Sequence, residues 1–190
     1  MKKKRDQRPQ RKMKPVFLVF CEGDTEEAYI NFLRREYRLS IKVIPRVTGL
    51  SLSQSIIRRY IQAEKLDNND KITTFLMYDL DIKSIAEKIA ACKGCISIAS
   101  NPSVELWFLL HFCEQKAAVS AADCIEKIRK ISGDWLEYKK GTFTEKQKRQ
   151  LWENRKPASA RARQLREGEN PSSSVYRLIE EMDAVNAQRR

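Results

Sequence analysis

The chain has 190 residues, enough for one sizeable domain or a domain with a small extension. Hydrophobic residues make up 42% of it, so a real core is possible and wholesale disorder is not expected. The formal net charge of +12 favours a polyanionic partner, most plausibly nucleic acid, although part of such a charge can serve solubility alone.

The sequence gives no sign of a membrane span or an export signal. Its apolar stretches are too short to cross a bilayer, and no apolar segment of a signal peptide follows the basic N-terminus. The number of cysteines is odd, five in all, which favours reduced thiols. We therefore expect a cytoplasmic protein without a membrane partner, in which the cysteines are small buried side chains and the Cys92–Cys95 pair is neither a zinc nor a redox site.

Hydrophobic periodicity divides residues 15–113 into alternating strands and helices. Apolar runs at 16–20, 41–47, 72–78 and 95–99 predict strands. Helices are predicted at 24–37, after Ser51 or Ser53, at 82–92 and at 103–112. A capping box of Asp24 and Glu27 would begin the first helix. Before all of these, residues 1–14 are strongly basic and predict a disordered tail or a phosphate-binding arm.

This alternation is typical of βαβ units. We predict an α/β fold with a four-stranded, mainly parallel sheet flanked by helices over residues 15–113. Helical periodicity follows at 123–131, 144–154, 158–166 and 174–185, with no further strand expected. Residues 114–190 are therefore interpreted as a helical C-terminal extension packed on the core, and its basic residues form either a nucleic-acid track or a solvated face.

Three carboxylates follow two of the predicted strands. Glu22 comes after the first apolar run, and Asp79 and Asp81 close the third. Parallel strands end at one edge of the sheet, where open α/β sheets bind ligands, so these side chains should meet there. Two of them lie two residues apart and would share one face of an extended strand. Such hard oxygen ligands predict a Mg²⁺ or Mn²⁺ site for work on phosphate esters.

The same carboxylates also have structural explanations. Glu22 could accept hydrogen bonds from backbone amides at the start of the next helix, and Asp81 could cap the helix that begins at Ile82. Glu26 lies in the first turn of its helix, where capping electrostatics explains it adequately, and a direct part in the site is the alternative.

Further residues at the same edge are candidates for binding the ion or the phosphate. Glu105, in the first turn of its helix, is a candidate metal ligand or supports one. Gly23 permits a close approach of phosphate, and Asn101 occupies a turn at the edge. A later loop carries Lys139 and Lys140, which could reach a scissile phosphate or be ordinary surface charge. His111, the only histidine, is expected to be structural.

Several motifs together resemble the RloB-like family: FCEGDTEEAYINFL, YDLD, SNPSVELWFLLHF, YKKG and NPSSSV. The resemblance covers nearly everything from Pro15 onward. That family is similar to the Toprim fold, the catalytic α/β module of topoisomerases, primases and OLD-type nucleases. The resemblance implies that Glu22 takes the strand-end glutamate position and that Asp79 and Asp81 take the D-x-D that holds Mg²⁺. It also implies a restriction-associated or abortive-infection role in bacterial defence, beside an AAA/ABC-type ATPase.

These observations favour a Mg²⁺-dependent nuclease acting on DNA or RNA. Glu22, Asp79, Asp81 and Lys140 would be catalytic; Glu22, Asp79, Asp81 and Glu105 would hold metal; and Gly23, Asn101, Lys139 and Lys140 would contact phosphate. The sequence has no P-loop motif, in keeping with a separate ATPase partner, and a homo-oligomer is possible. Two alternatives stay open: a noncatalytic nucleic-acid-binding or regulatory subunit of an ATPase complex, and an enzyme that acts on free nucleotides.

Overall fold

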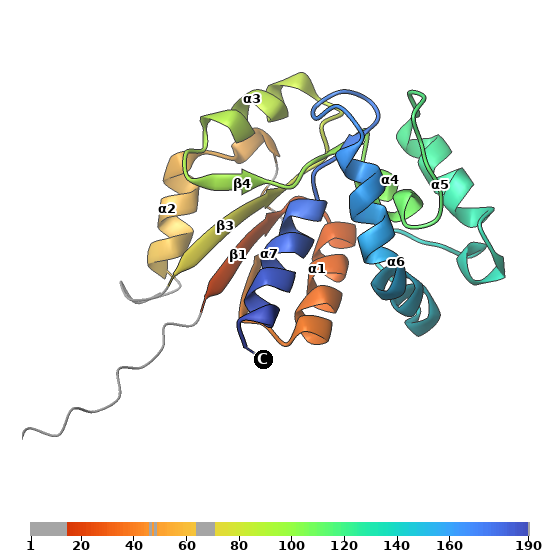
Figure 1. Ribbon diagram of the computed structural model, residues 1–190. Helices are drawn as coiled ribbons and strands as arrows, with labels where there is room; N and C mark the ends of the chain where they lie inside the picture. The colour runs from red at the N-terminus through yellow and green to blue at the C-terminus, as the bar shows by residue number, and fades with distance from the viewer. Residues whose placement is uncertain (1–14, 46, 48, 64–70, 190) are drawn as a thin grey trace, which may run out of the picture.

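Four parallel strands form the central sheet of the computed structural model, which describes residues 15–45, 47, 49–63 and 71–189 (Figure 1). The strands are β1 (Val16–Cys21), β2 (Ile41–Ile44), β3 (Ile72–Met77) and β4 (Cys95–Ser97), in the spatial order β2-β1-β3-β4. The predicted α/β class and parallel sheet are confirmed. The predicted basic tail at 1–14 lies outside the described residues.

Strand β1 is buried on both faces, and the alternation of its side chains explains why. Phe17, Val19 and Cys21 belong to one apolar cluster, whereas Leu18 and Phe20 belong to another. In Figure 1, α1 (Asp24–Tyr37) and α7 (Tyr176–Ala187) lie over one face, and α2 (Gln54–Ala63) and α3 (Lys83–Ala91) lie over the other. A continuous apolar run is therefore what a central strand between two helical layers requires.

The later helices share the core of the sheet. They are α4 (Val104–Leu110), α5 (Ala121–Arg129) and α6 (Glu145–Arg163), together with the short 3₁₀ turn η2 (Gly133–Trp135). An earlier 3₁₀ turn, η1 (Gly49–Ser51), comes between β2 and α2. Trp107 of α4 and Trp135 of η2 are fully buried in the same cluster as Phe17 and Val19. The division at residues 113 and 114 stays an interpretation, because one apolar cluster extends across it.

Two expectations about the C-terminal part are wrong. A second small sheet pairs β5 (Ser100–Asn101) antiparallel with β6 (Ser172–Ser173), where no strand was expected after residue 112. These serine-rich segments have no apolar alternation, so only their tertiary pairing makes them strands. The two helices expected at 144–154 and 158–166 are one helix, α6, with Pro157 inside it, and burial of Leu151, Ala158 and Ala162 holds the two halves in line.

Several element ends also differ from expectation. No capping box begins α1: its N-cap is Gly23, without a side-chain hydrogen bond, and Asp24 is already helical. Strand β2 ends at Ile44, and strand β3 ends at Met77, two residues before Asp79. Of the cysteines, Cys21, Cys92 and Cys124 are buried as expected, but Cys95 is half-buried and Cys113 is exposed. No helix within the described ranges combines the length and apolarity needed to cross a membrane.

The buried hydrogen bond from Trp107 Nε1 to Tyr29 Oη, 2.8 Å long, joins α4 to α1. Tyr29→Phe removes the acceptor and leaves the indole N–H buried without a partner. We expect the free energy of unfolding to fall by about 1–3 kcal/mol, measured by urea denaturation. Tyr60→Phe, at a partly exposed tyrosine, is the control and should change stability little. An equal loss in both variants would contradict this assignment.

Candidate functional site

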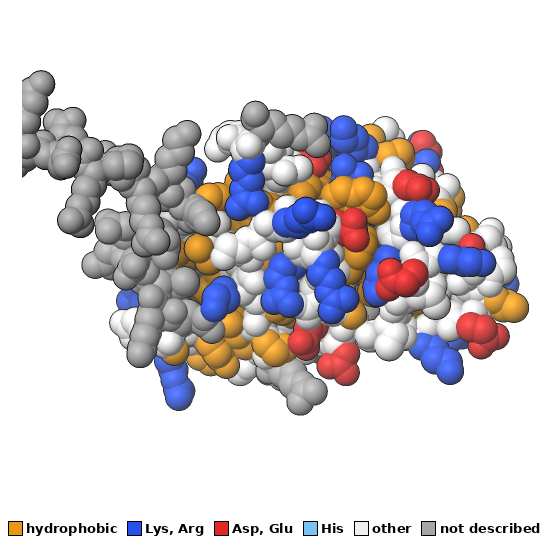
Figure 2. Space-filling model, turned by 90° about the horizontal axis from the view of Figure 1, so that it is seen from below, with side chains coloured by type: hydrophobic (Ala, Val, Ile, Leu, Met, Phe, Trp, Pro, Cys, Tyr) orange, Lys and Arg blue, Asp and Glu red, His pale blue; other side chains and the backbone are white. Residues whose placement is uncertain are grey.

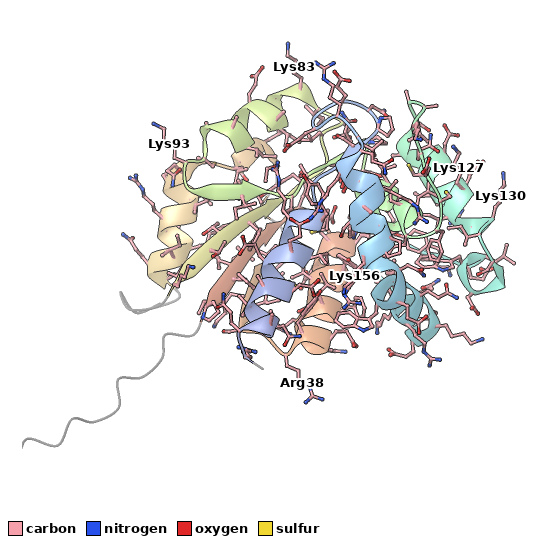
Figure 3. The ribbon with its side chains drawn as sticks, in the orientation of Figure 1. Arg38, Lys83, Lys93, Lys127, Lys130 and Lys156 are labelled. Atoms are coloured by element: carbon pink, nitrogen blue, oxygen red, sulfur yellow. The ribbon has the colours of Figure 1, made fainter. Side chains whose placement is uncertain are left out.

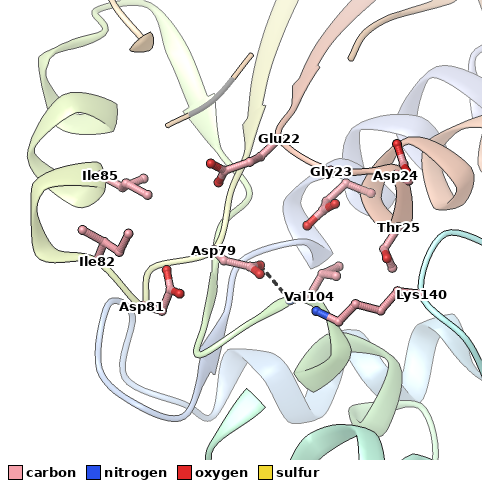
Figure 4. A pocket seen from close by; sticks show the side chains of 11 residues that line it. Glu22, Gly23, Asp24, Thr25, Asp79, Asp81, Ile82, Ile85, Val104 and Lys140 are labelled. Carbon is pink, nitrogen blue, oxygen red and sulfur yellow. Dashed lines mark hydrogen bonds between the residues drawn. The ribbon is translucent and has the colours of Figure 1, made fainter. Parts of the chain in front are cut away.

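The carboxyl edge of the sheet carries a cavity of about 410 Å³ (Figure 4). Its origin is the register of two central strands, in which Cys21 of β1 pairs with Met77 of β3. The residues after these positions therefore leave the sheet at the same level. The ionisable side chains that line the cavity are Glu22, Asp24, Glu26, Asp79, Asp81 and Lys140.

Glu22 follows β1 directly, and its Oε1 accepts a hydrogen bond from the backbone N of Gly49 at 3.0 Å. The amide belongs to η1, not to the first turn of α1 as the structural alternative expected. Gly49 is needed for this approach, since a Cβ there would lie 2.7 Å from Ile85 Cδ1. Glu22 thus joins the end of β1 to the turn before α2.

Asp79 and Asp81 do not lie on a strand, so the expected shared strand face is wrong. Asp79 forms an isolated bridge with Ser100, and its Oδ1 accepts from the backbone N of Val104 at 2.8 Å. Asp79 therefore satisfies an amide at the start of α4 from outside that helix. Asp81 does not cap α3, whose N-cap is Ile82 without a side-chain hydrogen bond. Both aspartates still line the cavity.

Crowding of carboxylates perturbs Asp79 strongly. Burial raises the pKa of Asp79 to about 8, and the negative charges of Glu26 and Glu105 add to the shift. The Val104 amide and the Lys140 ammonium oppose it without cancelling it. The pKa of Glu26 is raised as well, first by burial. The cavity therefore holds more negative charge than its own cations neutralise, which is the condition that favours a bound cation.

Glu26 is a cavity residue that the sequence left open between a helix-start charge and a direct part in the site. It is 6% exposed, and a Cβ on Gly23 would lie 2.8 Å from its Oε2. The absence of a side chain on Gly23 thus leaves room for the carboxylate of Glu26. This role is separate from the close approach of phosphate expected at Gly23. The signal that could have found Glu26 is its position in the first turn of a helix that begins at the ligand edge.

Glu105 lies beneath the cavity and does not line it. Its side chain is fully buried and has three partners. Ser103 Oγ donates to Oε2 at 2.7 Å, Tyr138 Oη donates to Oε1 at 3.2 Å, and Lys140 Nζ forms an ion pair with Oε1 at 3.4 Å. Lys140 is about half exposed and extends into the cavity, as Figure 4 shows.

The loop that carries Lys140 is fixed to the start of α1. Gly141 N donates to Thr25 Oγ1 at 2.9 Å, and Gly141 has a φ of 79°, which glycine adopts without strain. Thr25 also lines the cavity and was not predicted. Lys139, which directly precedes Lys140 in the loop, is exposed and lies outside the cavity lining. Asn101 lies outside it too, and its Nδ2 donates to Gly168 O.

His111 is buried away from the cavity, as expected for a structural histidine. Its Nδ1 lies 2.8 Å from the carbonyl oxygen of Trp107, and burial lowers its pKa to about 4. A neutral imidazole packed against Trp107 and Phe112 completes this part of the core.

The donor set of the cavity fits Mg²⁺ or Mn²⁺ by its chemistry. Its side chains offer hard carboxylate oxygens, and burial, together with the negative charges of Glu26 and Glu105, raises the pKa of Asp79. Over the residues with described positions, no three His, Cys, Asp or Glu side chains already stand as a ligand group. The amides of Gly49 and Val104 each donate to one carboxylate oxygen, of Glu22 and of Asp79 respectively, and so occupy one oxygen of each.

Basic side chains are spread over several sides of the molecule. In Figure 3 the labelled side chains extend outward from different elements, and in Figure 2 Lys and Arg are interspersed with Asp and Glu. Many lysine and arginine side chains of α6, and that of Arg166 just beyond it, have partners within the protein. Lys146, Lys148, Arg163 and Arg166 form ion pairs, and Arg155 stacks on Trp152. The predicted basic track is therefore largely engaged within the protein.

The raised pKa of Asp79 predicts a pH-dependent stability. Its pKa is about 8 in the fold against 3.8 when exposed, so between these values the folded protein binds the extra proton. Stability should be highest near pH 4 and fall toward pH 8, by at most about 1.4 kcal/mol per pH unit from this group. Asp79→Asn keeps an acceptor for Val104 and should flatten this slope in urea denaturation without divalent ions.

Asp81→Asn is the matched control for that measurement. Asp81 is exposed in the same cavity, so its substitution should leave the slope near that of the unsubstituted protein. A slope that Asp79→Asn does not change would show that this carboxyl group is not the one that titrates.

Comparison with known protein families places the chain. The chain matches the family described as RloB-like protein over residues 17–182, which is most of its length. Neither the curated proteins nor the solved structures yield a match. The matched range runs from β1 to α7 and so includes the whole cavity. The chain belongs to the RloB-like family.

Proposed function

We propose that the chain is a Mg²⁺- or Mn²⁺-dependent nuclease that hydrolyses phosphodiester bonds of DNA or RNA in a bacterial defence system. The observation that carries this proposal is the gathering of Glu22, Asp79 and Asp81 with Lys140 around one cavity. Excess carboxylate beside a single ammonium is suited to a divalent cation and a phosphate together. Membership of the RloB-like family supports the defence role.

The arrangement of the carboxylates supports the Toprim likeness. A glutamate directly after β1 and a D-x-D after the neighbouring parallel strand β3 follow the layout that the family resemblance implies. These positions come from distant parts of the sequence and converge through strand register alone.

Each cavity residue has a defined role in this proposal. Glu22, Asp79 and Asp81 would hold the cation, which supplies Lewis-acid polarisation of the phosphoryl group and a more acidic water. Glu22, directly after the carboxyl end of β1, would serve as ligand or general acid/base. Lys140 would neutralise charge that develops on the phosphate. Glu26, which is buried, adds a fourth carboxylate to the cavity and strengthens the demand for a cation.

The partners of the protein are part of the same proposal. The net charge of +12 supports a polynucleotide substrate, and an AAA/ABC-type ATPase is the expected companion. Assembly into a homo-oligomer would be compatible with this scheme.

One observation favours the noncatalytic alternative, a nucleic-acid-binding or regulatory subunit. Glu22 and Asp79 each accept a hydrogen bond from a backbone amide, of Gly49 and Val104 respectively. Carboxylates that only hold the starts of η1 and α4 would need neither a cation nor a substrate. The catalytic and noncatalytic alternatives differ in the effect expected on cleavage when the negative charge at these positions is removed.

Cleavage assays on plasmid, single-stranded DNA and tRNA, with Mg²⁺ or Mn²⁺ and with or without the neighbouring ATPase, test the proposal. Asp79→Asn with Asp81→Asn should abolish cleavage while the circular dichroism spectrum stays unchanged, because asparagine preserves the bond to Val104. Undiminished cleavage by this variant would end the proposal. Tight binding with a steep salt dependence but no cleavage supports the noncatalytic reading, and turnover of free nucleotides alone supports a nucleotide-directed enzyme.

Divalent ions should raise the melting temperature of the protein even without nucleic acid. Cation binding to the folded state alone stabilises it by about 2.7 kcal/mol at a hundred times the dissociation constant. We expect a dose-dependent rise with Mn²⁺ that is lost in the Asp79→Asn, Asp81→Asn variant. An equal rise in both proteins would place the ion elsewhere.

A further inference from the structure

Glu105 has the wrong surroundings for a metal ligand. A ligand oxygen must face the cavity, whereas the side chain of Glu105 is 0% exposed and lies outside the lining. Both of its oxygens are already engaged, Oε2 by Ser103 and Oε1 by Tyr138 and Lys140. These three partners are all donors, so the site around Glu105 is built to hold a carboxylate in place.

Lys140 has the opposite character. Its side chain is 56% exposed and ends in the cavity near Asp79, whose titration it influences. A lysine with this exposure ordinarily samples many rotamers, and ordering one costs up to about 2 kcal/mol. Within the described part of the chain, the side-chain partner of its ammonium is Glu105.

The backbone of the loop is also fixed from both sides of the lysine. Arg129 donates through Nε and Nη2 to the carbonyl oxygen of Tyr138, and Gly141 N donates to Thr25. The loop therefore presents Lys140 at a set place, and the remaining freedom lies in its side chain. An ion pair with a buried, immobile carboxylate removes that freedom.

We infer that Glu105 is a positioning residue: it holds the ammonium of Lys140 in the cavity from below and is not itself a metal ligand. This inference rests on the proposed function for the role of Lys140 in catalysis. The tether itself follows from the contacts of Glu105. Substitution of Glu105 should therefore displace Lys140, and the loss of its negative charge should in addition lower the pKa of Asp79.

The first test reads the order of Lys140 without any substrate. Lysines of the full chain are reductively methylated with ¹³C-formaldehyde, which keeps their charge, and the Lys140 signal is assigned with Lys140→Arg. We expect restricted motion of the Lys140 methyl groups in NMR relaxation, with exposed Lys139 as the mobile internal reference. In Glu105→Gln the Lys140 signal should become as mobile as that of Lys139. Unchanged order in Glu105→Gln overturns the inference.

The second test is a double-mutant cycle on cleavage. Lys140→Met should lower kcat by about 10²-fold, the size found for loss of one transition-state donor. Glu105→Gln should lower kcat by roughly 10-fold or more with little change in KM, since a displaced catalytic group costs up to about 10²-fold. In the Lys140→Met background, Glu105→Gln should have no further effect. Additive losses would overturn the inference.

Tyr138→Phe separates positioning from general packing. It removes one hydrogen bond to Glu105 and leaves the pair with Lys140. This variant should lose stability in urea denaturation, yet keep an ordered Lys140 and nearly full kcat. If Lys140 loses order in Glu105→Gln but the unsubstituted protein cleaves nothing, the tether stands and the proposed nuclease function fails.

Discussion

The pairing of Cys21 with Met77 in the parallel sheet is the constraint on which the site depends. β1 and β3 are apolar and their inner residues are buried on both faces, so the register between them is set by core packing. Wherever that register holds, the residues after the two strands emerge together. Glu22 and Asp79 owe their proximity to this, although 57 positions in the sequence separate them.

Charge imbalance is the second organising feature. A folded chain rarely gathers buried carboxylates unless donors or cations accompany them. Here backbone amides and Lys140 compensate only part of the charge, as the raised pKa values of Asp79 and Glu26 express. Glu105, by contrast, is matched by three donors. The cavity and the surroundings of Glu105 thus differ: the cavity carries negative charge that its donors compensate only in part, whereas the carboxylate of Glu105 has donors for both of its oxygens.

The C-terminal half contributes directly to the cavity. The loop with Lys140 joins η2 to α6, and the helices around it share the core of the sheet. Pairing of β5 with β6 holds the segment of Ser100 beside Asp79. A sheet domain without these later segments would lack both the ammonium of Lys140 and part of the support of Asp79. The family match extends from β1 to α7 and includes these segments.

The sequence by itself determined the four strands of the main sheet and most of the helices, because apolar periodicity reports burial directly. It also located Glu22, Asp79 and Asp81 at the ligand edge, since polar residues that end apolar runs of a parallel sheet must emerge there. It did not indicate β5 and β6, whose serine-rich segments have no such periodicity. Only the tertiary structure decided which way each side chain turns. Glu26 entered the cavity, Glu105 went beneath it, and Asn101 and Lys139 stayed outside its lining. Such outcomes depend on contacts between distant segments, such as Gly141 with Thr25 and Ser172 with Asn101, which no local pattern encodes.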